Sequence, residues 1–251
     1  TDTVLLADVF ERFRALCLQH YELDPAHYIT LPSLGWDACL KMSPVTLHLL
    51  TDGDMYEFFE KGIRGGISCI THRYARANNK LLPGYDPTLP TSYIISLDAN
   101  NLYGWAMSQF MPVSDFRWLS DDEISALDIM SVPPDAEMGY VLDVDLEYPD
   151  HLHDIHNDYP LAPEKMAIKD EWLSPYSLDL REKLGIKSAK VPKLVPNLRS
   201  KTHYHIHYRN LQQYLALGMQ LTRIHRVIEF RQSAWMAPYI KFNTEMRKQA
   251  K

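Results

Sequence analysis

The chain has 251 residues, of which 46% are hydrophobic and 23% are charged. This length and composition allow one large or two small domains with a substantial core, which excludes an intrinsically disordered protein. The net charge of −6 alone argues against a nucleic-acid-binding protein. The charge is unevenly distributed, however, because residues 181–251 carry 15 Lys and Arg against 3 Glu. This polarity favours a basic face that meets phosphate, with solvated faces of opposite sign as the alternative.

The cysteines and the apolar runs indicate the cellular setting. Cys17, Cys39 and Cys69 are odd in number, widely spaced and without a Cys-x-x-Cys pair. This pattern predicts neither a disulfide framework nor a zinc ribbon, and it favours a reducing, intracellular setting. No apolar run approaches the roughly 18 residues that span a bilayer, so we expect no membrane partner. The choice between nucleus and organelle stays open.

The first 60 residues predict helices around a turn-rich linker. Apolar residues recur at three- and four-residue spacing over residues 2–20, which predicts a helix that Asp2 is suited to cap. Turn-forming residues interrupt residues 21–43, which we interpret as a linker packed on the core. Short helices are expected over residues 43–50 and 54–61.

Paired glycines follow within a basic window. Residues 61–80 contain five basic side chains and no acid. A glycine backbone can approach an anion closely, so Arg64, Gly65 and Gly66 are candidate contacts to the DNA backbone. An ordinary glycine turn is the alternative.

The stretch 92–107 combines an apolar run, an acid and a helical pattern. Residues 93–97 predict a short strand that ends at Asp98, and residues 102–107 are compatible with a helix. A carboxylate and the next backbone carbonyl at such an edge can supply oxygens to a divalent cation. A turn or capping role for Asp98 is the alternative.

The segment Asp98-Ala99-Asn100-Asn101-Leu102-Tyr103 resembles motif A of the family B DNA polymerases, an Asp followed by a Ser-Leu-Tyr-like triplet. The resemblance implies that Asp98 is a catalytic carboxylate and that Asp98 and the Ala99 carbonyl are ligands of Mg²⁺. It also implies nucleotide contacts from the residues of this turn, namely Ala99, Asn101, Leu102 and Tyr103. In that family the tyrosine packs under the incoming sugar and excludes a ribose hydroxyl. Asn101 and Gly104 depart from the usual Ser and Pro.

Two further motifs occur in the order of that family. Asp2 resembles the Asp of the third exonuclease motif, which opens a helix, and the resemblance implies a metal ligand there. Ile63-Arg64-Gly65-Gly66 resembles the Tyr-x-Gly-Gly motif of protein-primed members, which contacts template DNA. Ile63 replaces the Tyr, so only the glycine backbone and Arg64 match the motif.

The chain becomes acidic after motif A. Residues 115–180 contain 17 acidic side chains against 3 basic ones, a composition that opposes a role in lining a DNA channel. Protein-primed polymerases carry an insertion here that holds the terminal protein. The resemblance therefore implies that residues 112–190 bind a terminal, priming protein, which we expect to be basic.

Two acid-rich patterns within this segment suggest other sites. Residues 139–148 alternate as a strand, and we interpret Asp143 and Asp145 as its polar face rather than as motif C, because nothing resembling motif B precedes them. Residues 150–158 are rich in His and Asp, but they lack a standard zinc spacing. A solvated polar loop is the favoured interpretation there, with a transition-metal site as the alternative.

The last part of the chain is basic and aromatic. Residues 193–196 predict an edge strand, residues 208–217 a helix stopped by Gly218, residues 221–230 a strand and residues 239–251 a helix. Lys193 and Lys201 are candidate contacts to DNA.

The order of these motifs implies a fold and a function. The expected class is α+β, with a polymerase palm-type antiparallel sheet, packed helices, an inserted subdomain and the tail of an exonuclease domain. We expect an exonuclease-like tail and linker over residues 1–60 and the start of the palm over residues 61–111. The insertion would follow over residues 112–190, and residues 191–251 would return to the palm and begin the fingers. The chain resembles a fragment of a protein-primed DNA polymerase, closest to the type found in self-synthesising DNA transposons and linear plasmids.

The implied reaction is nucleotidyl transfer from a deoxynucleoside triphosphate to a primer on a DNA template, with two Mg²⁺ ions. Motifs B and C are not found, so the 251 residues alone are expected to be inactive. The alternatives are a nucleic-acid-binding or partner-binding module without catalysis, and a metal-dependent nuclease that uses Asp98, Asp143 and Asp145.

Overall fold

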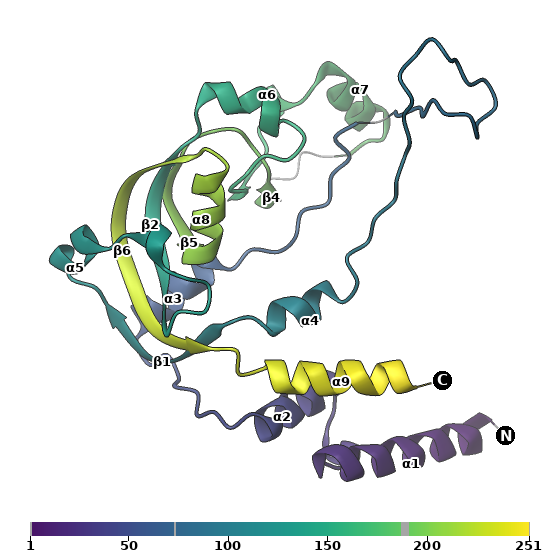
Figure 1. The fold of residues 1–251 in the computed structure, drawn as a ribbon, viewed down its shortest axis with the longest axis vertical. Helices are drawn as coiled ribbons and strands as arrows, with labels where there is room; N and C mark the ends of the chain where they lie inside the picture. The colour runs from purple at the N-terminus through teal and green to yellow at the C-terminus, as the bar shows by residue number, and fades with distance from the viewer. Residues whose placement is uncertain (1, 73, 187–190, 251) are drawn as a thin grey trace.

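The central feature is a curled antiparallel sheet. The structure, a computed structural model, describes residues 2–72, 74–186 and 191–250 (Figure 1). Four strands follow the order β1-β6-β2-β5, namely β1 (Met111–Trp118), β6 (Gln220–Ser233), β2 (Met138–Glu147) and β5 (Lys201–His207). All three neighbouring pairs are antiparallel. The class is therefore α+β with an antiparallel sheet, as the sequence predicted.

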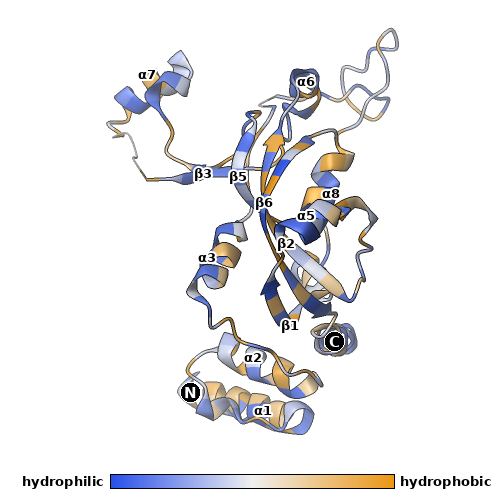
Figure 2. Ribbon diagram, turned by 90° about the vertical axis from the view of Figure 1, so that its left-hand side faces the viewer, coloured by the Kyte–Doolittle hydropathy of each residue, from blue (hydrophilic) through white to orange (hydrophobic). Residues whose placement is uncertain are grey.

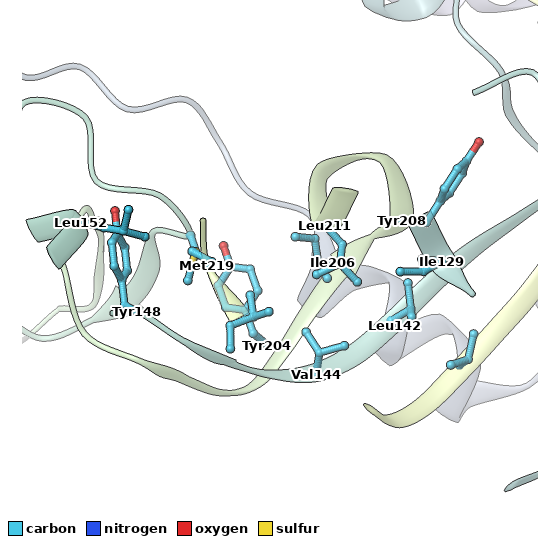
Figure 3. Close-up of a cluster of buried hydrophobic side chains, with 13 residues drawn as sticks. Ile129, Leu142, Val144, Tyr148, Leu152, Tyr204, Ile206, Tyr208, Leu211 and Met219 are labelled. Atoms are coloured by element: carbon cyan, nitrogen blue, oxygen red, sulfur yellow. The ribbon is translucent and has the colours of Figure 1, made fainter. Parts of the chain in front are cut away.

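One face of this sheet is covered by α8 (Tyr208–Ala216). Leu142, Val144 and Leu146 alternate along β2 toward this face, and each has at most 1% of its surface exposed. They pack with Leu211 of α8 and with further buried residues around it (Figure 3). The predicted stop of α8 is confirmed, because Gly218 has a φ of +104°, a conformation that glycine adopts without strain.

The opposite face packs against α3 (Gly53–Gly62). Phe58 of α3 contacts Val141, Ile228 and Phe230, and its ring lies edge-on to Trp118 at 5.0 Å. Asp52 caps this helix by accepting hydrogen bonds from two backbone amides of its first turn. The predicted helix over residues 54–61 is confirmed.

Three helices pack together beside the sheet. These are α1 (Asp2–Tyr21), α2 (Leu31–Met42) and α9 (Ala237–Gln249), which lie side by side in Figure 1. The hydroxyl of Tyr21 donates to Asn243 Oδ1, and Trp36 lies edge-on to Trp235 at 5.9 Å. The two ends of the described chain are thereby joined in one group of helices.

The sequence misplaced one helix in this region. Residues 44–52 contain no helix, whereas α2 lies inside the predicted linker. Thr30 caps α2 and Pro32 lies in its first turn, where proline needs no amide hydrogen bond. A proline inside a helix interrupts it, but Pro32 stands in the first turn and is therefore compatible with the start of α2.

A second misplaced element precedes α4 (Leu102–Met107). The predicted strand over residues 93–97 is wrong, because these residues are extended but pair with no strand among the described residues. Tyr93 is 63% exposed and Leu97 is 89% exposed. A strand needs a neighbour to satisfy its backbone groups, and the described residues between 63 and 101 contain no helix or strand.

The remaining elements are short. α5 (Asp121–Ala126) begins with a capping box between Ser120 and Glu123. Five elements are single helical turns. Four of them are 3-10 helices, namely η1 (Pro25–His27), η2 (Ile129–Ser131), η3 (Asp150–Leu152) and η4 (Asp170–Trp172), and the fifth is α6 (His153–His156). β3 (Glu164–Met166) and β4 (Lys193–Val195) form a two-stranded sheet, and with α7 (Pro175–Lys183) they extend away from the central sheet (Figure 2).

The predicted insertion shares the central sheet with its flanks. β1 and β2 fall inside residues 112–190 or at their edge, but they pair with β6, and β2 also pairs with β5. The sheet therefore crosses the predicted division at residue 190, and residues 187–190 themselves lie outside the described residues. None of the described helices has the length and hydropathy needed to cross a bilayer.

Candidate functional site

The turn that resembles motif A begins α4. Asn101 is the residue before the helix and has a φ of +54° and a ψ of +42°, the left-handed conformation. Asparagine tolerates this conformation better than most residues with a side chain. The amide of Trp105 donates to the carbonyl of Asn101 at 2.9 Å, which closes the first helical turn. The structure thus confirms the predicted helix over residues 102–107, and the left-handed residue before it was not expected.

The two departures from the motif depend on each other. A Cβ atom placed on Gly104 would lie 2.4 to 2.7 Å from three side-chain atoms of Asn101. Any larger residue at position 104 therefore collides with the Asn101 side chain as it lies here. Asn101 and Gly104 form a matched pair that replaces the Ser and Pro of the family pattern.

A cavity of about 540 Å³ lies between this turn and α9. Asn100, Asn101 and Gly104 line one side, and Arg247 and Lys248 of α9 contribute to the other. The two walls are about 150 positions apart in the sequence, and α4 and α9 are neighbours in Figure 1. The fold thus brings amide side chains and two cations around one opening.

The cations of this cavity are placed to meet an anion. Lys248 forms an ion pair with Glu245 at 2.8 Å, and both side chains are largely exposed. Such exposed pairs are weak, so Lys248 exchanges partners at little cost. Arg247 and Lys248 also lie in the last turn of α9, where cations interact favourably with the helix dipole. A purely structural role at the helix end is therefore the alternative to phosphate binding.

The predicted metal ligands are not gathered into one cluster. Asp98, Ala99 and Tyr103 are exposed, with Tyr103 at 86%, and Asp2 lies exposed in the first turn of α1. Among the described residues, no group of three metal-ligating side chains includes Asp98 or Asp2. Asp98, Asp143 and Asp145 likewise form no such group, so the structure gives no support to the nuclease alternative.

The predicted DNA contacts differ in their availability. Gly65 and Gly66 are exposed, and an added Cβ would meet no atom within 4 Å, so neither glycine is required by a close contact here. Arg64 donates to the carbonyl of His205 at 2.6 Å and stacks over the ring of Tyr204 at 3.8 Å. Its guanidinium thus anchors the loop to β5. Arg73 of the same basic window lies outside the described residues.

The two lysines predicted to contact DNA, Lys193 and Lys201, have opposite environments. Lys193 is exposed at the start of β4 and is available to a ligand. The Lys201 side chain is 0% exposed, and its ammonium donates to Glu164 at 2.9 Å and to Asn197. The prediction that Lys201 contacts DNA is corrected, because an ammonium that is buried and paired inside the fold cannot reach a phosphate.

The structure also gathers a cluster that the sequence did not predict. Ligand atoms of Asp143, His203 and His225 lie within 4.8 Å of one another. Asp143 Oδ2 is 3.0 Å from His203 Nδ1, and the two imidazole rings are stacked with centroids 4.0 Å apart. A sequence signal was present, since His203, His205 and His207 alternate along one strand. Residues 150–158, the predicted alternative for such a site, contribute to no metal-ligating group in the described chain.

Comparison with known proteins identifies no family for this chain. Compared with protein-family models, curated proteins and solved structures, the chain gives no match.

Proposed function

We propose that the chain is part of a protein-primed family B DNA polymerase and that it binds the incoming deoxynucleoside triphosphate. The observation that carries this proposal is the cavity shared by the motif A turn and the basic end of α9. Asn100, Asn101 and Gly104 line it together with Arg247 and Lys248. Its volume of about 540 Å³ is within the usual range for small-molecule sites.

Different residues would contact the sugar and the phosphates of the nucleotide. Tyr103 and Leu102 are exposed beside the turn, so their apolar surfaces are available to the sugar. Arg247 supplies a planar, permanently charged donor, and Lys248 a second cation, for the triphosphate. This arrangement favours a nucleotide over an uncharged ligand of the same size.

The donor set at the turn matches part of a magnesium site. The exposed carboxylate of Asp98 and the carbonyl of Ala99 are oxygen donors of the kind that Mg²⁺ prefers. Magnesium in such a site neutralises phosphate charge and activates the primer hydroxyl. Asp98 would be one of the two carboxylates required, and the second would come from another segment. Template and primer would contact Lys193 and the loop that contains Gly65 and Gly66.

The acidic segment supplies a second part of the proposal. Its β3 and the first part of α7 extend away from the central sheet (Figure 2), which leaves this arm accessible to a partner. Because residues 115–180 carry 17 acids against 3 bases, we propose that this segment binds a basic priming protein.

Equilibrium binding of a fluorescent dATP tests the nucleotide proposal. We expect saturable binding that strengthens when Mg²⁺ is added. Arg247→Ala should weaken it about tenfold, the loss of one charged hydrogen-bonded contact. Arg12→Ala removes an exposed arginine from α1 and serves as the matched control. Equal affinity for the Arg247→Ala and Arg12→Ala proteins would refute the assignment of the cavity.

A further inference from the structure

Three neighbouring strands bring one carboxylate and two imidazoles to a single point. Asp143 lies in β2, His203 in β5 and His225 in β6, and β2 is the strand between the other two. Their ligand atoms lie within 4.8 Å of one another. This cluster is separate from the motif A cavity, and none of the three residues lines it.

A β-bulge in β6 places His225. Asp143 is opposite Arg226 and Val144 is opposite Ile224, so His225 is an extra residue with no partner on β2. A bulge changes the direction of a side chain and interrupts the ladder locally. His225 is thereby removed from the ordinary alternation of the strand.

A second bulge, in β5, places His203. Val144 is opposite Tyr204 and Leu146 is opposite Lys201, so β5 has an extra residue between these pairs. His203 lies there with a φ of +49°, in the left-handed region that residues with side chains rarely adopt. Its amide donates to Asp145 Oδ1 at 2.9 Å, which holds this conformation. Two bulges, one on each side of Asp143, thus bring both histidines to it.

The cluster contains buried polar atoms that lack partners. Asp143 is 7% exposed, and its Oδ1 atom is buried without a hydrogen bond, although its Oδ2 atom is 3.0 Å from His203 Nδ1. His225 Nε2 is also buried without a hydrogen bond, and it lies 2.9 Å from Asp145 Oδ1. An unsatisfied buried carboxylate oxygen costs free energy, and such groups are rare in folded proteins. A bound cation would satisfy both atoms.

We propose that Asp143, His203 and His225 bind a divalent transition-metal ion, with zinc as the best match. Two imidazoles and one carboxylate are the ligands that zinc and its first-row neighbours prefer, whereas Mg²⁺ and Ca²⁺ prefer oxygen ligands. Donor atoms around a tetrahedral zinc ion lie about 3.3 Å apart, so small side-chain rotations bring the three atoms to that spacing. The His203 side chain is 65% exposed, which leaves room for rotation and for a water ligand.

Asp145 acts as a positioning residue for this site. Its carboxylate accepts the amide hydrogen of His203, which holds that residue in the left-handed conformation beside Asp143. Hydrogen bonds around metal-binding residues fix how those residues are oriented. The ion would therefore join β2, β5 and β6, the three strands with the most deeply buried core.

Metal titration of the purified, metal-stripped 251-residue chain tests the proposal. We expect one zinc ion per chain by calorimetry, and a Co²⁺-substituted protein with the visible absorption of a site containing nitrogen and oxygen ligands. Asp143→Asn and His203→Ala should each weaken zinc binding by at least about tenfold. His203→Ala changes an exposed side chain, and circular dichroism establishes that each variant is folded.

His151→Ala provides the matched control, because it removes an exposed histidine from the His- and Asp-rich residues 150–158. Its zinc affinity should equal that of the unmodified chain. The proposal is overturned if the folded chain binds no stoichiometric zinc, if folded His203→Ala binds as tightly as the parent, or if His151→Ala instead removes the site. Nucleotide binding at the other cavity is measured separately, so either assignment can fail alone.

Discussion

The side chain of Asn101 occupies the space that a Cβ atom on Gly104 would need. Three of its atoms lie 2.4 to 2.7 Å from that position. Asn101 itself is left-handed at φ +54°, so the turn requires both a residue that tolerates this conformation and a glycine three positions later. This pairing determines how the motif A turn enters α4.

Gly104→Ala should therefore loosen the first turn of α4. The added methyl displaces Asn101, and we expect faster hydrogen exchange at the amides of Trp105 and Ser108, which donate to the carbonyls of Asn101 and Gly104. Asn101→Gly removes the obstructing side chain and still tolerates positive φ. In the Asn101→Gly background, Gly104→Ala should thus have little effect. If Gly104→Ala accelerated hydrogen exchange equally in the parent chain and in the Asn101→Gly background, the contact between Asn101 and position 104 would be unimportant.

Lys201→Ala should affect stability rather than DNA binding. Its ammonium is buried and donates to Glu164, and burial lowers the pKa of Lys201 while the Glu164 hydrogen bond raises it. Removing one partner of such a pair costs about 3 kcal/mol, to be measured by urea denaturation. Lys193→Ala, at an exposed site, is the comparison for DNA affinity. A salt-dependent loss of DNA binding by folded Lys201→Ala, without loss of stability, would show instead that Lys201 contacts DNA.

His207 should make the fold sensitive to acid. Burial and, to a smaller extent, the nearby Arg209 together lower the pKa of His207 to about 4. Its ring nitrogen accepts a hydrogen bond from the Arg209 amide at the start of α8. Between pH 6.5 and 4 the unfolded chain gains a proton that the native chain does not, so stability falls as the pH falls. The loss reaches about 3 kcal/mol near pH 4. His207→Asn keeps a neutral cap, and its denaturation midpoint should change less over this range.

Local patterns predicted the elements whose causes are local. The structure contains the predicted helices over residues 54–61 and 102–107 and the predicted strand over residues 139–148. Each depends on capping or periodicity within about ten residues. The apolar residues 93–97 show the limit of this reasoning, because a strand also requires a partner that periodicity does not reveal.

The candidate sites depend on contacts that no local pattern contains. The cavity joins Asn101 to Arg247, and the metal cluster requires two bulges that set the register of His203 and His225 against Asp143. Register follows from side-chain packing across the whole sheet, which a single sequence does not show. The sequence did indicate Asp98 and Tyr103 by resemblance, but it assigned Lys201 to the surface because burial was not visible.

Asp98→Ala should remove the part of nucleotide binding that depends on Mg²⁺. The Asp98 carboxylate is exposed and, on the proposed function, is a magnesium ligand beside the triphosphate. We expect the affinity for dATP to become equal with and without Mg²⁺, while the magnesium-independent affinity stays the same. Asp154→Ala, an exposed acid in the acidic segment, should retain the magnesium effect. An undiminished magnesium effect in Asp98→Ala would favour a binding-only module.

Photoaffinity labelling with an azido derivative of dATP tests the central claim most directly. In the presence of Mg²⁺, peptide mapping should find the label on residues 100–107 or 240–248, the two walls of the cavity. Unlabelled dATP should suppress the labelling, and ATP should suppress it less, because on the proposed function Tyr103 excludes a ribose hydroxyl. Labelling that is not saturable, or that maps to other peptides and is indifferent to dATP, would contradict the assignment of this cavity as a nucleotide site.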